Sequence, residues 1–414
     1  MGGMTGMSYK ITKSMLSAMA VAAAVVACKT DRPTAPNPGG PASASRGPMN
    51  PALIAQGKDI FRFDTYGDES FWTDTLRMHE VIRTSVNPTT ALSVGLKVDV
   101  DALPAAVKAA LANHTIDLND PATTVALLKL GAVLGVIGHV DASNTLTAVG
   151  VTCALCHSTV DNSFAPGIGH RLDGWPNRTL NVGAIIALSP ALTAAQKAVY
   201  SSWGPGMYDP RFNIDGQNIP VVIPPAFGLR NVAREIYTGD DTISYWNAYV
   251  AITQMHGHGH FSDPRIGVTV DNPPDLVSSK LAALRTYQFS LETPPPIPGT
   301  YDVAAAKRGR QVFNAVADCA SCHRSSVDTD VNQGILHTPA EVGQDPVYAL
   351  RSATELYRTT PIRGLWHPPQ LTGPYFHDGH AATLEAAVDH YVKLQGLSLT
   401  AQQRSDLIEY LKTL

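Results

Sequence analysis

The sequence is poor in cysteine and in net charge. Its 414 residues include five cysteines and carry a formal net charge of −4. So small a charge gives no basic surface of the kind that binds nucleic acid, and so few cysteines give no disulfide framework. At this length, with 44% hydrophobic residues, the chain can bury a large core, and we expect two folded domains.

Four of the five cysteines form two copies of one short motif. Residues 153–157 read Cys-Ala-Leu-Cys-His and residues 319–323 read Cys-Ala-Ser-Cys-His, and both fit the C-x-x-C-H haem-attachment pattern. The two thiols can add to the vinyl groups of one haem, and the adjacent histidine can bind its iron. We therefore predict two covalent c-type haems. A four-cysteine zinc site or a disulfide arrangement is the alternative, but it leaves both histidines unexplained. The residues expected to hold haem 1 and then haem 2 are Cys153, Cys156, His157, Cys319, Cys322 and His323.

The first 27 residues are typical of a targeting segment. Lys10 and Lys13 precede an apolar run, residues 15–27, that is too short to span a bilayer as a mature helix. The run ends in small residues before Cys28, which resembles a bacterial lipoprotein cleavage site. We expect a lipid anchor through Cys28 and a location in the periplasm or cell envelope. An ordinary secretory signal with an incidental cysteine is the alternative, and with either the protein leaves the cytoplasm, as covalent haem attachment requires in bacteria.

Composition divides the rest of the chain at two Pro-rich stretches. We expect a mainly α fold of two cytochrome c-like haem domains with long loops, the N-terminal one enlarged by insertions. The predicted parts are a flexible tether (28–50), an N-terminal haem domain (51–293), a proline-rich linker (294–299) and a C-terminal cytochrome c domain (300–414).

Apolar spacing predicts the main helices. In cytochrome c folds a glycine on the first helix lets an aromatic residue of the last helix approach closely, and here we expect Gly309 to meet Tyr410 or Leu411. The predicted helices cover 51–62, 70–84, 104–112, a buried stretch at 121–136, 303–316 and 400–414.

Two further stretches carry a resemblance to a known family. Residues 371–379, Leu-Thr-Gly-Pro-Tyr-Phe-His-Asp-Gly, and the following 381–388 resemble the C-terminal signature of the bacterial di-haem cytochrome c peroxidase and MauG superfamily. Residues 167–170, Gly-Ile-Gly-His, resemble the stretch that holds the distal histidine of its peroxidatic haem. The resemblance therefore implies that His170 is the distal ligand of haem 1 and moves away when haem 2 is reduced. Residues 51–130 and 185–290 match nothing in the peroxidases.

The chain departs from the peroxidases at the sixth ligand of haem 2. The peroxidases place a methionine there, but this sequence has no methionine after Met255, and the corresponding position is Tyr391, with His390 beside it. MauG-like members use tyrosine and other members use histidine. We favour His390, because a phenol must lose a proton to bind iron whereas imidazole need not. Tyr391 is the alternative ligand. Either ligand predicts a lower potential for haem 2 than a thioether gives.

The resemblance also implies a calcium ion between the two domains. The family builds this site from an asparagine side chain and backbone carbonyls, and the carbonyls correspond to Thr372 and Pro374. Asn177 is the nearest asparagine, and it lies one position out of register. Oxygen ligands of this kind suit calcium.

Three functions remain open at this point. The resemblance implies a peroxidase in which electrons enter at haem 2, cross to haem 1 and reduce hydrogen peroxide. The missing methionine favours a MauG-like or oxygenase-type enzyme that uses hydrogen peroxide or dioxygen to oxidise an organic or protein substrate. The third function is pure electron transfer. The expected electron donor is a periplasmic small cytochrome or cupredoxin, no nucleic acid is expected as a partner, and formation of a homodimer is left open.

Overall fold

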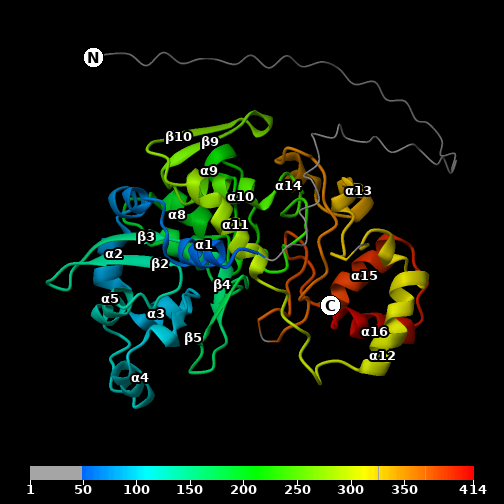
Figure 1. Ribbon diagram of the computed structural model, residues 1–414, viewed down its shortest axis with the longest axis horizontal. Helices are drawn as coiled ribbons and strands as arrows, with labels where there is room; N and C mark the ends of the chain where they lie inside the picture. Colours follow the sequence, from blue (N-terminus) through cyan, green and yellow to red (C-terminus); the bar gives the residue numbers. More distant parts are fainter. Residues whose placement is uncertain (1–48, 325, 369) are drawn as a thin grey trace. The chain divides into compact units, whose positions relative to one another are not determined.

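The computed structural model describes residues 49–324, 326–368 and 370–414, which belong to one compact unit (Figure 1). The predicted signal segment, Cys28 and nearly all of the predicted tether lie outside the described residues. Within those ranges, none of the helices is long and apolar enough to cross a membrane.

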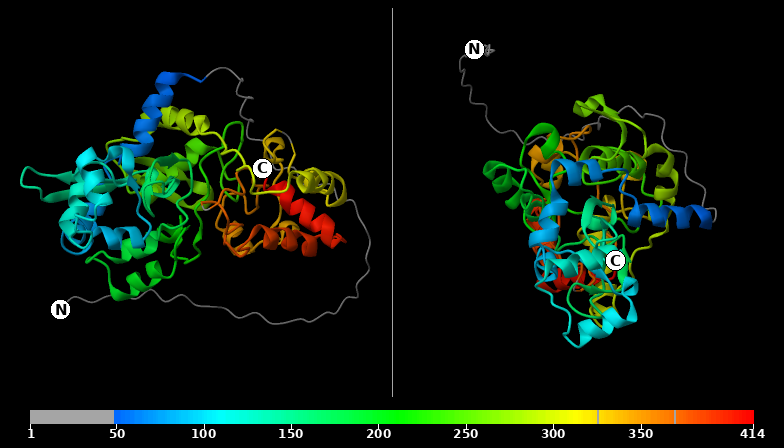
Figure 2. Two further views of the ribbon diagram at one scale, coloured as in Figure 1. Left: turned by 90° about the horizontal axis from the view of Figure 1, so that it is seen from below. Right: turned by 90° about the vertical axis from the view of Figure 1, so that its left-hand side faces the viewer.

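Eleven α-helices are described before residue 294. The first begins with a cap: the Asn50 side chain accepts a hydrogen bond from the N–H of Ala52, and Pro51 occupies the first turn. This helix packs along α11, as both views in Figure 2 show. The two helices approach closely at Gly57, where an added Cβ would lie only 2.0 Å from the carbonyl oxygen of Ala283. The helices are α1 (Pro51–Phe63), α2 (Met78–Ser85), α3 (Pro88–Ser93), α4 (Ala105–Ala112), α5 (Pro121–Lys129), α6 (Ala154–His157), α7 (Val182–Ala187), α8 (Ala194–Ser201), α9 (Phe212–Asp215), α10 (Ile243–Tyr249) and α11 (Leu281–Ser290).

Short strands pair two by two in the same part of the chain. Two of these pairs flank the first cysteine motif, which follows β3 and leads directly into β4, and a third brings residues 168–169 beside residues 98–99. The antiparallel pairs are β2 (Val136–Val140) with β3 (Leu146–Val151), β4 (Ser158–Val160) with β6 (Arg171–Asp173), β7 (Met207–Tyr208) with β8 (Val221–Val222), and β9 (Gly259–Asp263) with β10 (Val268–Asn272), whereas β1 (Val98–Asp99) pairs parallel to β5 (Ile168–Gly169).

Two of the predicted helices are wrong in extent. The helix predicted over 70–84 is a π-helical turn, η1 (Ser70–Thr75), followed by α2, because Arg77 between them takes a left-handed conformation with φ 56°. The buried helix predicted over 121–136 ends at Lys129. Gly131, with φ 63°, turns the chain out of the helix, and Val136 already belongs to β2.

The C-terminal part has its own hydrophobic cluster, which includes Phe313, Val388 and Leu407. Helices α12 and α16 pack against each other (Figure 1). A Cβ on Gly309 would lie 1.9 Å from the carbonyl oxygen of Asp406 and 2.9 Å from Cβ of Tyr410, which confirms the predicted close contact with the last helix. The helices here are α12 (Val303–Gln311), the π-helical turn η6 (Val312–Val316), α13 (Pro339–Val342), α14 (Pro346–Leu350), α15 (Leu384–Leu394) and α16 (Ala401–Leu411).

A buried carboxyl joins η1 to the hairpin that leads into the first cysteine motif. Asp68 is fully buried, and its Oδ1 accepts a hydrogen bond from the N–H of Val151 at 3.2 Å. Burial raises the pKa of Asp68 to about 9. The folded chain therefore holds a proton that the unfolded chain releases, and the free energy of unfolding falls as pH rises through the interval between the ordinary carboxyl pKa and 9.

Asp68→Asn keeps the acceptor oxygen and removes this titration. We expect the loss of stability between pH 5 and pH 8 to be smaller in the variant, because each pH unit in which only the folded state binds the proton costs about 1.4 kcal/mol. Denaturant unfolding at several pH values measures the slope, with Asp59→Asn on the exposed side of α1 as the control. Equal slopes for Asp68→Asn and the unmodified protein would show that Asp68 is ionised when folded.

Candidate functional site

The first cysteine motif folds as a single helical turn between two strands. Helix α6 follows Cys153, and the backbone N–H of His157 donates to the carbonyl of Cys153 at 3.2 Å. This turn brings both thiols and the imidazole together within five residues. Cys153 and Cys156 are not in a disulfide, and both pack against the main hydrophobic cluster. Burial raises the pKa of each thiol to about 12, so both are neutral thiols rather than thiolates.

The histidine of this motif is held in one tautomer by the fold. Its Nδ1 lies 3.1 Å from the carbonyl oxygen of Pro224, 67 residues further along the chain. Burial lowers the pKa of His157 to about 4, so the ring is neutral, and Nδ1 must carry the proton that the carbonyl accepts. The lone pair is therefore on Nε2, where an iron ligand needs it.

The second motif repeats this arrangement with a nearer acceptor. A 3-10 turn, η7 (Cys319–Ser321), opens it, and the N–H of His323 donates to the carbonyl of Cys319 at 3.0 Å. His323 Nδ1 lies 3.1 Å from the carbonyl oxygen of Asp328. Burial again lowers the pKa of the histidine, so Nε2 is left for a metal here as well.

These contacts fit haem better than the alternatives. None of the four cysteines is in a disulfide. Within the part of the chain that the structure describes, the side chains that lie close enough together to share a metal ion are Cys322, Asp330 and His337. The two cysteine pairs therefore do not form a four-cysteine site. Two neutral thiols beside a histidine with a free Nε2, found twice, are what two thioether bonds and a proximal ligand require.

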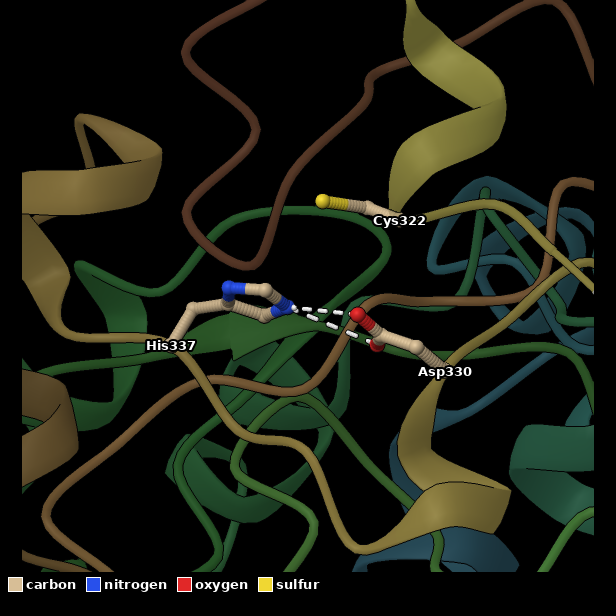
Figure 3. A group of neighbouring side chains, drawn as sticks. All are labelled: Cys322, Asp330 and His337. Atoms are coloured by element: carbon tan, nitrogen blue, oxygen red, sulfur yellow. Dashed lines mark hydrogen bonds and ion pairs between the residues drawn. The ribbon is translucent and has the colours of Figure 1, made fainter. Parts of the chain in front are cut away.

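Two members of this group, His337 and Asp330, are hydrogen-bonded to each other, and Figure 3 draws no such bond from Cys322 to either. His337 is buried, and its Nε2 lies 3.1 Å from Asp330 and 3.0 Å from the hydroxyl of Thr359, while its Nδ1 lies 2.9 Å from Glu341. The hydrogen bond to Asp330 raises the pKa of His337. The sequence did not predict that Cys322, Asp330, His337 and Thr359 lie together, because these residues are spread over positions 322–359 and follow no motif spacing.

Comparisons with known proteins agree with the haem assignment. The family profile described as "Cytochrome c" matches residues 306–414. The methylamine utilization protein MauG of Methylorubrum extorquens is 30% identical over 135 residues, which cover 27% of this chain and 35% of MauG. A cytochrome-c peroxidase of Denitromonas iodatirespirans is 26% identical over 152 residues, which cover 27% of this chain and 40% of the relative. Over these matched stretches the chain is similar to proteins of the di-haem cytochrome c peroxidase and MauG family.

The matches have limits. The chain spans only 35% to 40% of the length of these two curated relatives. The crystal structure of a MauG-like protein associated with microbial copper homeostasis overlaps 34% of this chain and 58% of its own, at 21% identity and a TM-score of 0.26. An overlap this small carries no structural argument.

His170, the distal ligand that the peroxidase and MauG family implies, lies at the surface. It follows β5, and its side chain is 59% exposed. Its Nδ1 lies 2.9 Å from Oδ2 of Asp101, and this hydrogen bond raises the pKa of His170. Pairing of β5 with β1 causes the contact, because it brings the residues after each strand together. Ligation of iron by His170 stays a prediction.

The two candidate sixth ligands of haem 2 have different surroundings. Burial raises the pKa of Tyr391 to about 12, and the thiols of Cys322 and Cys319 add to the shift, so the phenol lies near the second motif. His390 Nε2 lies 3.0 Å from the carbonyl oxygen of Val342. The identity of the ligand stays a prediction.

The family's calcium site is not decided by these contacts. Asn177 is buried, its amide donates to the carbonyl of Gly95 at 2.9 Å, and its Oδ1 accepts a hydrogen bond from Thr179 at 3.0 Å. Thr372 is exposed, and Pro374 is partly buried. Calcium binding by Asn177, Thr372 and Pro374 stays a prediction.

If each pair of cysteines attaches its own haem, a substitution in one pair should remove only that haem. We expect Cys156→Ala and Cys322→Ala each to reduce the haem content from two per chain to one, because each pair of thiols serves one haem. Pyridine haemochrome absorbance per mole of protein measures this, with Cys28→Ser as the control. One haem per chain in the unmodified protein, coexpressed with a haem-attachment system, would contradict the assignment of two.

Proposed function

We propose that this chain is a di-haem oxidoreductase that reduces hydrogen peroxide with electrons from a periplasmic small cytochrome or cupredoxin. The observation that carries this proposal is the same arrangement found twice: neutral thiols beside an imidazole whose Nδ1 bonds a backbone carbonyl. Each haem, when bound, supplies one-electron transfer and, where an axial position is open, cleavage of the peroxide O–O bond. Residues of this chain orient the haems, tune them and supply their protein ligands.

His157 and His323 orient and tune the two sites. Donation of Nδ1–H to a carbonyl fixes each ring and makes Nε2 more basic, which favours the ferric state. The acceptors are the carbonyls of Pro224 and Asp328. Because a carbonyl is neutral, it raises the basicity of Nε2 less than a carboxylate would.

Trp175 supports electron passage between the two parts of the chain. It is buried and packs with Phe227 and Leu371 in one hydrophobic cluster. Its ring meets that of His367 edge to face, with centroids 4.6 Å apart. An aromatic ring in contact with segments from both parts is suited to bridging two redox centres.

Tyr391 is the sixth ligand of haem 2 that the contacts support. His390 Nε2 donates to the carbonyl of Val342, so this nitrogen cannot bind iron while that hydrogen bond is made. Burial raises the pKa of Tyr391 to about 12, and the charges that the thiols of Cys322 and Cys319 can carry add to this shift. A phenolate ligand stabilises ferric iron, and this favours the second candidate function, a MauG-like oxidation of an organic or protein substrate.

His170 would act as the movable ligand of haem 1. Its backbone N–H donates to Oδ1 of Asp161 at 2.8 Å, and its ring is hydrogen-bonded to Asp101. Asp101 is bonded to Nδ1, so Nε2 stays free to bind iron, and the contact is exposed and therefore too weak to hold the ring in one place. A small differential free energy between redox states is enough to select one position.

The remaining parts of the proposal rest on the sequence. They are export to the periplasm or cell envelope, a lipid anchor through Cys28, and calcium at Asn177, Thr372 and Pro374. If peroxide cannot reach the iron of haem 1 in any redox state, the function is pure electron transfer.

Replacement of His170 tests the peroxidase proposal. We expect His170→Gly to react with hydrogen peroxide in the fully oxidised state, because haem 1 then lacks a protein ligand to displace, whereas the unmodified protein reacts only after haem 2 is reduced. Stopped-flow absorbance with and without one electron equivalent measures this. His114→Gly, at an exposed histidine, is the matched control. A His170→Gly variant with an unchanged spectrum and no peroxide reaction in any redox state would favour the electron-carrier function.

A further inference from the structure

A cavity of about 140 Å³ lies between two segments that are far apart in the sequence. On one side it is lined by Pro224, whose carbonyl holds His157. On the other side it is lined by Leu365 and Tyr375, which pack against the same hydrophobic cluster as Cys319. The cavity therefore adjoins both candidate haem sites.

Arg178 reaches this cavity with an unpaired guanidinium. Its Nε and Nη1 atoms are shut off from solvent and have no hydrogen-bond partner among the described residues. The charged or ionisable groups that act on its guanidinium are the phenols of Tyr237 and Tyr375. Both phenols donate to backbone carbonyls, those of Val222 and Leu365, so they supply no negative charge.

Four arginines whose side chains are shut off from solvent show how unusual this is. Each has a side chain that is less than a tenth exposed, and each has a carboxylate within hydrogen-bond distance. The pairs are Arg171 with Asp99 at 3.1 Å, Arg211 with Asp240 at 3.0 Å, Arg351 with Asp209 at 3.0 Å and Arg358 with Glu235 at 3.1 Å. A buried cation without a counter-ion is costly, so Arg178 needs an anion that the polypeptide does not provide.

We propose that Arg178 binds a propionate carboxylate of the haem held by Cys319 and Cys322. A haem attached through its vinyl groups keeps two free carboxylates, and a guanidinium matches a carboxylate with two parallel hydrogen bonds. Phe376, which lines the cavity, contacts the ring of Tyr391 with 5.8 Å between the centroids, so the cavity extends to side chains expected around the second haem. The inference rests on the haem assignment within the proposed function but not on peroxide turnover.

The contact has two consequences for haem 2. A cation beside the propionate offsets its negative charge, so ferric iron is less stabilised and the potential is higher than it would be without Arg178. The cation also keeps the propionate ionised across neutral pH, so the potential changes little with pH.

The test is the reduction potential of each haem in Arg178→Gln. We expect the equilibrium of haem 2 to shift about tenfold toward the oxidised form, which is about 59 mV for one electron. We also expect a new pH dependence between pH 5 and 8, as the propionate begins to titrate. Arg178→Lys should recover most of the shift, because it restores the charge. Spectroelectrochemistry gives both potentials, and Arg285→Gln, at an exposed arginine on α11, is the matched control.

Three outcomes would overturn the proposal. The first is an unchanged potential for haem 2 in Arg178→Gln with full haem content, and the second is a shift confined to haem 1. The third is a saturable change in the spectrum or potential of the unmodified protein on addition of sodium acetate that is lost in Arg178→Gln, because this would show a site for a free carboxylate. If Arg178→Gln does not retain haem, the resonance Raman bands of the propionates in Arg178→Lys decide instead. Lysine restores the charge but not the two parallel hydrogen bonds of a guanidinium, so shifted bands support the contact. Bands identical to those of the unmodified protein contradict it.

Discussion

A neutral imidazole that donates Nδ1–H to a backbone carbonyl is the interaction on which both candidate haem sites depend. It requires burial, which keeps the ring uncharged, and an acceptor at the right place. The two sites obtain the acceptor differently. Asp328 is five residues from His323, so the second site forms locally, whereas Pro224 is 67 residues from His157, so the first site exists only when the N-terminal part has folded. This difference gives a physical role to the long N-terminal segment.

Buried ion pairs hold the two sites in one arrangement. Arg351 pairs with Asp209 and Asp215, and Arg358 pairs with Glu235, so cations from the C-terminal part are neutralised by carboxylates more than a hundred positions earlier. Such pairs add little net stability, but they fix a geometry, because removal of one partner leaves a buried charge. Electron transfer between two centres needs a fixed separation of this kind, and the unpaired Arg178 lies in the same region.

The sequence predicted the elements whose signals are local. The two cysteine motifs and the first and last helices follow from residue types within a few positions of one another, whereas the close approach at Gly309 was expected from the general build of cytochrome c folds. Contacts between distant segments left no such signal. The carbonyl of Pro224, the cluster around His337 and the pairing of His170 with Asp101 depend on how loops meet, and any residue supplies a backbone carbonyl. The break at Arg77 was missed because arginine rarely adopts a left-handed conformation.

The central claim is that one chain holds two haems with unlike axial ligands and coupled states. Optical and electron paramagnetic resonance spectra of the holoprotein, recorded fully oxidised and after addition of one electron per chain, test this most directly. The account predicts two distinct ferric species, one of which has the ligand signature of a histidine with a tyrosinate, and a change in the ligation of haem 1 when haem 2 is reduced. A single haem species, or two six-coordinate haems that titrate independently with unchanged ligands, would contradict it.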